Sequence, residues 1–404
     1  MFKRGFLLAA LVLVLGLVVM PAAAQEGRQV YAFYFGWYTG DSWGDPRLTD
    51  HPAQPYDSRD AGALGRHIDE ARGAGIDAFI MSWYGPKNDN LTHQVFNALL
   101  DQAGARGFRA GAVVDMHEAG YNATVEEVTQ SLSYLINDRA NHPAYLRYDG
   151  KPVIYFWNQG RFNLAQWQQI RQQVDPNRGT IWVMEGTSTG LMPAFDGLYL
   201  FNTAWSGNPA ATAQQWANRT RAAGGWFYTP TVLPGWDESA LAAGRPNPTT
   251  VRPRNNGQFL TNSWNGAVSS GASIILIVSW NEYLENSHIE PSQQFGTQAL
   301  DTLRPLIEAW KSGAPAPAPG GAPGGEAGSP TGVTYTVNSN LRLRSAPNTG
   351  ADIITTVPFN STVDVIGRLG DSSWVQVNFG GGSGWMSSSF GQFSGDLNTV
   401  PVTG

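Results

Sequence analysis

Apolar, β-rich runs alternate with amphipathic segments along residues 30–279. Several of the segments between the runs repeat apolar residues at helical spacing, as in residues 61–75, where Leu64, Ile68 and Ala71 share one face. Buried strands that alternate with helices predict a (β/α)8 TIM-type barrel, an α/β fold. The eight predicted strands are residues 30–35, 76–82, 108–114, 152–157, 180–185, 197–201, 226–232 and 272–279.

A doubly wound parallel sheet is the alternative interpretation of this alternation. Such sheets usually carry a glycine-rich phosphate-binding loop after the first strand. Here the first strand continues into GWYTGDSWGDP, residues 36–46, which is an aromatic and acidic loop. The loop therefore favours the barrel over the doubly wound sheet.

Polar and aromatic residues recur where the predicted strands end. In a (β/α)8 barrel the chemistry lies at the C-terminal ends of the strands. The last strand runs directly into SWNEYLENSHIEP, residues 279–291, which places Asn281, Glu282 and Glu285 at such an end. The other strand-end residues are Tyr34, Trp37, Trp83, Asp115, Glu118, Asn158, Glu185, Asn202 and Asp237. We expect a site there, although loop residues are polar in any case.

Three further segments flank the predicted barrel domain, residues 28–311. The basic Lys3 and Arg4, an apolar run at 6–19 and a small-residue AAA before Gln25 predict a signal peptide over residues 1–24. An uncleaved membrane anchor is the alternative interpretation of this segment. Residues 312–332 are rich in Pro, Ala and Gly, which is typical of an extended linker. Residues 333–393 contain short strands and turns, which predict a small all-β domain.

The composition narrows the chemistry. A net charge of −6 and 14% charged residues argue against a nucleic-acid partner. The chain has no cysteine, so disulfides and thiolate zinc sites are excluded. Neither an Asp-x-Asp-x-Asp loop nor paired histidines at ligand spacing occurs, so we expect no metal and no cofactor. No G-x-S-x-G elbow joins a predicted strand directly to a helix, which argues against a serine hydrolase that carries its nucleophile in this motif.

Paired carboxylates beside aromatic rings suit the cleavage of glycosidic bonds. One carboxyl group can protonate the leaving oxygen while the other stays charged. Glu282 and Glu285 stand three residues apart in a loop after a strand, where both could reach one bond. The 15 tryptophans, 14 tyrosines and 18 phenylalanines could supply sugar-stacking faces, although most should lie in the core.

Longer motifs resemble glycoside hydrolase family 99. SWNEYLENSHIEP resembles the N-E-W-x-E-x-x-x-I-E-P signature of that family, with Tyr283 in the Trp position and Asn286-Ser287 in place of Gly-Thr. YAFYFGWY, PYDSRD, HIDEARGAGIDAFIMSWYG, HPAYLRYDGKPVIYFW and LPGWDES are similar to its other blocks, in the same order over residues 30–300. The loop after the first strand lacks the family's common His-Trp pair.

The resemblance implies a (β/α)8 enzyme that cleaves α-mannosidic bonds inside chains with retention. The resemblance also implies how the bond is cleaved. Glu282 would act as the base on the sugar's own 2-hydroxyl, which attacks C1, and Glu285 would act as the acid that protonates the leaving group. Glu290 would be structural, near a helix start. The residues that we expect to contact the sugar are Tyr34, Trp37, Trp83, Glu118, Asn281 and Asp237.

The C-terminal domain resembles a bacterial SH3-like domain. The resemblance rests on LRLRSAP, the SSWVQV strand and GWM near the end, all within residues 333–393. Such domains often hold cell-wall peptides or glycans, and a passive spacer is the alternative. Trp374 and Trp385 could serve as core residues or as a ligand platform.

Together these features predict a secreted or cell-surface bacterial glycosidase acting on α-linked, mannose-containing polysaccharide, with no membrane attachment after signal cleavage. A second hypothesis is a non-catalytic glycan-binding or wall-associated protein that kept the barrel. The retained Glu282 and Glu285 favour the enzyme. A third, a protein associated with capsule synthesis, fits poorly with a signal peptide because sugar-nucleotide donors are cytoplasmic.

Overall fold

A computed structural model describes residues 27–118, 120–241, 249–313, 331–351, 353–379 and 382–403. The predicted signal peptide, residues 1–24, lies outside the described residues, as does most of the predicted linker. No helix among the described ranges is long and apolar enough to cross a membrane.

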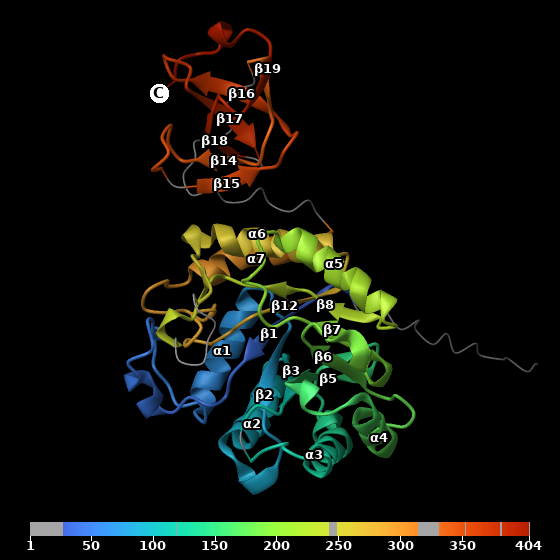
Figure 1. The fold of residues 1–404 in the computed structure, drawn as a ribbon. Helices are drawn as coiled ribbons and strands as arrows, with labels where there is room; N and C mark the ends of the chain where they lie inside the picture. The colour runs from blue at the N-terminus through green and yellow to red at the C-terminus, as the bar shows by residue number, and fades with distance from the viewer. Residues whose placement is uncertain are drawn as a thin grey trace, which may run out of the picture.

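The first domain is a parallel β-barrel surrounded by helices (Figure 1). Each strand pairs in parallel with its neighbour, and β12 pairs with β1, the first strand of the chain. All eight predicted strands form, which confirms the barrel. Their bounds are β1 Gln29–Tyr34, β2 Ala78–Trp83, β3 Arg109–Asp115, β5 Lys151–Trp157, β6 Ile181–Glu185, β7 Gly197–Tyr199, β8 Phe227–Thr229 with β9 Thr231–Val232, and β12 Ile274–Ile277.

The seventh predicted strand forms in two parts because of one proline. Pro230 separates β8 from β9, and proline has no N–H to donate to a neighbouring strand. β8 pairs with β7 on one side and β9 pairs with β12 on the other, so the two parts together close the ring. Two antiparallel pairs are added outside it, β4 Arg147–Tyr148 with β5 and β10 Trp236–Asp237 with β11 Val251–Arg252.

Helices follow most strands. After β6 a 3-10 segment, Thr189–Ala194, stands where the pattern would place an α-helix. Polar side chains cap several helix starts; Asp60, for example, accepts from the N–H of Gly62 at the start of α1. The α-helices of this domain are α1 Ala61–Gly73, α2 Leu91–Ala105, α3 Val125–Asn137, α4 Leu164–Val174, α5 Pro209–Ala222, α6 Gln258–Ser269 and α7 Gln298–Ser312.

Alternate residues of each strand belong to two different apolar layers, because successive side chains point to opposite faces. In β1, Tyr31 and Phe33 belong to the cluster inside the barrel. Val30, Ala32 and Tyr34 belong to the larger cluster between the strands and the helices. This alternation decides which strand-end residues can face the open end of the barrel.

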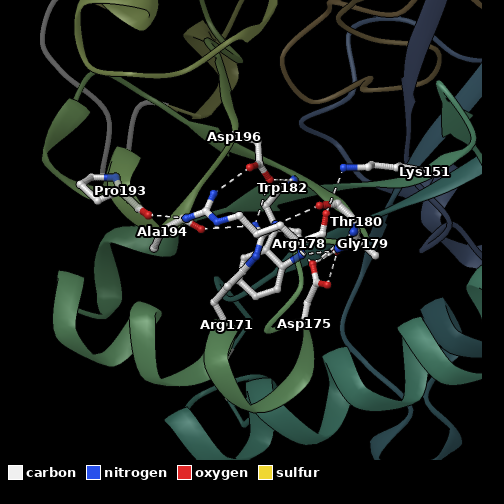
Figure 2. A network of polar contacts seen from close by, with 10 residues as sticks. All are labelled: Lys151, Arg171, Asp175, Arg178, Gly179, Thr180, Trp182, Pro193, Ala194 and Asp196. Carbon is white, nitrogen blue, oxygen red and sulfur yellow. Dashed lines mark hydrogen bonds and ion pairs between the residues drawn. The ribbon is translucent and has the colours of Figure 1, made fainter.

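A buried ion network ties α4 to the strands beside it (Figure 2). Arg171 of α4 contacts Asp196 at 2.9 Å and Asp175 at 3.2 Å, and its guanidinium lies 4.3 Å from the ring centroid of Trp182. Arg178 contacts the other oxygen of Asp196 at 2.8 Å. The charges of Arg171 and its two carboxylates are therefore compensated within the protein.

The second domain is an antiparallel sheet around its own core, in the order β15-β14-β18-β17-β16-β13-β19. Trp385 is buried and Trp374 is half-buried, so Trp385 serves the packing of this domain. The strands are β13 Thr334–Val337, β14 Leu341–Arg344, β15 Ile353–Val357, β16 Thr362–Arg368, β17 Trp374–Phe379, β18 Gly382–Ser387 and β19 Gly391–Ser394.

Candidate active site

A cavity of about 560 Å³ opens at the C-terminal ends of the barrel strands. It combines aromatic rings with carboxylates, which is the composition expected of a sugar site. The lining residues are Phe33, Phe35, Trp37, Tyr84, Asp115, His117, Trp157, Phe201, Asn202, Trp236, Leu241, Glu282, Leu284 and Glu285. The structure therefore brings Glu282, Glu285 and Trp37 of the predicted site together.

The two glutamates lie in a loop that is closed on itself after β12. The N–H of Ser279 donates to the carbonyl of Ser287 at 2.8 Å, and the N–H of Ser287 donates to the carbonyl of Glu282 at 3.1 Å. Glu282 is 5% exposed, and its Oε1 accepts from the N–H of Leu284 at 3.0 Å. Glu285 is half-buried, and its carbonyl accepts from the N–H of Asp237 at 2.9 Å. The loop thus fixes both carboxylates on one wall of the cavity.

Asn281 joins the last strand of the barrel to the first, and it does not line the cavity. Its Oδ1 accepts from the N–H of Phe35 at 2.8 Å, and its Nδ2 donates to the carbonyl of Phe35 at 2.8 Å. Nδ2 also lies 2.9 Å from the hydroxyl of Tyr56. The side chain is fully buried, so it positions the neighbouring Glu282 and Phe35 and has no access to a sugar. This corrects its assignment as a sugar contact.

Glu290 is buried beneath the same loop. Its Oε1 lies 2.9 Å from Nε2 of His67, and its Oε2 accepts from the hydroxyls of Tyr283 at 3.1 Å and Tyr56 at 3.3 Å. Burial, and next the charge of Glu290, raises the pKa of both phenols, so they remain donors. The structural role expected of Glu290 fits this network, but α7 begins only at Gln298, so Glu290 does not start a helix.

Tyr34 and Trp83 do not reach the cavity, which corrects two of the predicted sugar contacts. Tyr34 is fully buried, with its hydroxyl 3.1 Å from Nδ1 of His67. Trp83 is also fully buried, and its indole N–H donates to Nδ1 of His93 of α2 at 3.3 Å. Both side chains belong to the apolar layer between strands and helices, because each lies at an outward-facing position of its strand.

Glu118 and Asp237 also lie outside the cavity lining. Glu118 is exposed on the loop after β3. Asp237 is half-buried in β10, and its Oδ1 accepts from the N–H of Ser239 at 2.9 Å. Its main chain supports the Glu285 loop, as described above. The structure thus places Asp237 in a supporting position and Glu118 on the surface.

The strand alternation could have located lining residues that the site prediction missed. Phe33 and Phe35 share the inward face of the first strand, and Trp157 ends the fourth strand of the barrel on its inward face. Phe201 packs edge-to-face on Trp157, with ring centroids 4.8 Å apart. The aromatic content of the cavity therefore comes from inward positions next to the strand ends.

Two further carboxyl groups lie at the open end of the barrel. Asp115 lines the cavity and accepts from the hydroxyl of Ser82 at 2.7 Å and the N–H of His117 at 2.8 Å. Burial raises the pKa of Asp115. Glu185, at the end of β6, accepts from the N–H of Phe201 at 3.3 Å, and burial raises its pKa to about 7. A carboxyl group with a pKa of about 7, as in Glu185, can exchange protons near neutral pH.

No cluster of three or more His, Asp or Glu side chains that could hold a metal ion occurs in the described part of the chain. The cavity itself offers carboxylates and aromatic rings. A (β/α)8 barrel with paired carboxylates and aromatic rings at this end has the fold and the site of a glycoside hydrolase.

Comparisons with known proteins agree with that class. The profile of glycosyl hydrolase family 99 matches residues 50–304, so the chain belongs to this family, and a bacterial SH3 domain profile matches residues 339–392. A mouse (Mus musculus) protein named glycoprotein endo-alpha-1,2-mannosidase is 24% identical over 355 residues, 71% of this chain and 75% of its own length. A human (Homo sapiens) glycoprotein endo-alpha-1,2-mannosidase-like protein is 25% identical over 329 residues, 67% of this chain and 70% of its own.

The fold has a counterpart of known structure. The structure of a GH99 endo-alpha-mannosidase from Bacteroides thetaiotaomicron aligns with a TM-score of 0.61 at 20% identity. The alignment covers 71% of this chain and 99% of that one. The barrel therefore accounts for essentially the whole of the aligned structure, and the SH3-like domain is additional to it.

Proposed function

We propose that this glycoside hydrolase is a retaining, endo-acting enzyme on α-linked, mannose-containing polysaccharide. Glu282 acts as the base toward the 2-hydroxyl of the sugar, and Glu285 protonates the leaving oxygen. The observation that carries the proposal is that both carboxylates line one aromatic cavity at the strand ends. The mannose specificity and the endo action rest on the name of the mouse relative, a glycoprotein endo-alpha-1,2-mannosidase.

The difference in burial between the two glutamates suits these two roles. Glu282 is almost fully buried, and the main-chain N–H of Leu284 that donates to its Oε1 fixes its position. Glu285 is more exposed, on the side of the loop that faces Asp237. A base that acts inside the cavity and an acid nearer its rim fit a leaving group that departs toward solvent.

The test is to replace each carboxylate with its uncharged isostere. Glu282→Gln and Glu285→Gln should each lower kcat on α-mannan by about 10²- to 10⁴-fold, the usual contribution of a positioned acid or base. Glu308→Gln, on the exposed face of α7, is the matched control and should keep full activity. Product anomers read by NMR should show retention. Full activity in either site variant would refute the assignment of Glu282 and Glu285 as the catalytic pair.

The same assay separates the enzyme from a non-catalytic glycan-binding protein on this barrel. An enzyme releases new reducing ends from α-mannan. A binding protein would retain the polymer without releasing any. Including α-glucans in the screen tests the proposed specificity for mannose separately from the proposed catalytic residues.

The proposal also includes location and a second partner. The basic residues, apolar run and small-residue site at the N-terminus support export and cleavage before Gln25. The bacterial SH3 domain supports attachment to cell-wall peptide or glycan. N-terminal sequencing of exported protein tests the first point; a start other than Gln25 would move the cleavage site. Pull-down of the isolated domain on purified wall tests the second.

A further inference from the structure

Trp205 is a large aromatic residue left exposed at the same end of the barrel as the cavity. Its side chain is 53% exposed, although tryptophan is usually well buried. It follows β7 by a few residues, and Asn202, three residues earlier, lines the cavity. No aromatic or cationic side chain among the described residues is recorded against its ring. Because the ring is exposed and has no such neighbour, its face is available to a ligand.

The exposed ring is nevertheless held in place. The indole N–H of Trp205 donates to the carbonyl of Asn202 at 2.9 Å, and Oδ1 of Asn202 accepts from the N–H of Ala204 at 2.7 Å. The next residue, Ser206, is buried, and its hydroxyl lies 2.6 Å from that of Thr212 in α5. The loop is therefore braced on both sides of Trp205, and one edge of the indole is fixed toward the cavity rim.

A fixed, exposed aromatic face is suited to stacking against the C–H face of a sugar ring. It offers a large contact area with little loss of side-chain entropy on binding. A mobile surface tryptophan would lose its rotamer freedom first. Since Asn202 joins this ring to the cavity wall, a sugar on Trp205 would belong to the same polymer as the sugars at the glutamates.

We propose that Trp205 is a sugar platform at the cavity rim, which binds a unit of the polysaccharide beyond the two that flank the cleaved bond. This inference rests on the proposed function and extends it. It implies that affinity depends on chain length, because a disaccharide that spans the cleaved bond does not include the unit that binds to Trp205. Longer chains gain the stacking contact, as expected for an enzyme that acts inside a polymer.

The experiment titrates two probes, α-mannobiose and α-mannotetraose, into the Glu285→Gln protein by calorimetry. Adding Trp205→Ala should weaken binding of the tetraose by about tenfold, equivalent to 1.4 kcal/mol. Binding of the biose should change less than about twofold. Trp205→Phe should recover most of the tetraose affinity because it restores an aromatic face.

Trp226 provides the matched control. It is 56% exposed, but it precedes β8 at the opposite end of the barrel and packs edge-to-face on Phe227. Trp226→Ala should leave both affinities unchanged. An equal loss for both probes or an unchanged tetraose affinity would overturn the platform. A wild-type protein that cleaves no α-mannoside would instead overturn the proposed function, while the titrations would still decide the role of Trp205.

Discussion

At the scale of single residues, the most consequential side chain outside the cavity is Glu290. It accepts from two phenols and contacts His67, and one of those phenols belongs to Tyr283, next to Glu282. These contacts therefore hold the loop that carries Glu282 and Glu285, the proposed catalytic pair. A buried carboxylate with three partners is costly to alter, because each partner would remain desolvated.

Replacing Glu290 by glutamine should disturb both folding and catalysis. We expect a loss of about 1–3 kcal/mol in the free energy of unfolding, since an amide cannot satisfy His67 and both phenols as a carboxylate does. We expect kcat to fall more than KM changes, because the loop and not the aromatic wall is affected. Urea unfolding and steady-state kinetics measure the two effects.

Tyr283→Phe is the milder companion variant, since it removes a single hydrogen bond from Glu290. It should give a smaller loss in kcat than Glu290→Gln. Stability lost in Glu290→Gln with kcat unchanged would show that the network supports the fold alone.

Glu185 should make stability depend on pH. Burial raises its pKa to about 7 in the folded protein, well above the value of an exposed glutamate. Between about pH 4.5 and 7 the folded state therefore binds the proton and the unfolded state does not. The free energy of unfolding contributed by this group is then fully present below about pH 4.5 and falls by about 3 kcal/mol as pH rises through 7.

Glu185→Gln should remove that part of the pH dependence. The measurement is urea unfolding at pH 5 and pH 8 for both proteins, because the difference between them isolates Glu185 from other titrating groups. The variant should gain stability relative to wild type at pH 8. An identical pH dependence in the two proteins would show that Glu185 titrates as an exposed carboxyl.

The sequence predicted three residues that line the cavity, Glu282, Glu285 and Trp37, but misplaced two aromatic residues. Tyr34 and Trp83 were chosen because they end strands, whereas the alternation within each strand shows that they point outward. Asn281 was placed correctly along the chain, but its clasp on Phe35 joins residues 246 apart. No local pattern reports such a pairing, so the buried role of Asn281 required the structure.

At the scale of elements, buried ion pairs join α4 to the barrel in addition to its apolar packing. Arg171→Met should lower the free energy of unfolding by about 3 kcal/mol, because Asp175 and Asp196 are left buried with less compensation. Arg178→Met is the matched control, since Arg178 reaches the same Asp196 from an exposed position and should cost less than about 1 kcal/mol. Equal losses in urea unfolding would contradict this division.

Element types followed from the sequence more readily than their interruptions. The long apolar runs specified all eight strands, because a strand buried on both faces needs such a run. The break at Pro230 was visible as a proline within WFYTPTV and could have been predicted. The 3-10 segment after β6 could not have been predicted in this way, because it packs against α4 and no local sequence signal specifies it.

At the scale of the whole molecule, the two domains should be separable. Every residue of the cavity lies upstream of residue 312, and the linker composition favours an extended chain. A protein lacking residues 313–404 should keep its kcat/KM on a soluble substrate and lose its retention on wall material. The domain boundaries at 28–311, 312–332 and 333–393 remain predictions that this truncation tests.

Two measurements on the truncated protein have distinct meanings. A folded but inactive truncation would mean that the second domain completes the site. Unchanged wall retention would reduce the SH3-like domain to a spacer. Circular dichroism and thermal unfolding establish that the shortened chain is folded before either result is interpreted.

The two hydrogen bonds between the Asn281 side chain and the main chain of Phe35 also determine when, during synthesis, the active site can form. Phe35 is synthesised near the start of the chain and Asn281 near the end of the barrel, so the site cannot form until residue 281 has left the ribosome. Contacts of such sequence separation are slow to form. For the export that we propose, a chain that crosses the membrane unfolded carries no assembled active site. Its hydrolytic activity would begin only after the last strand has joined the barrel on the far side of the membrane.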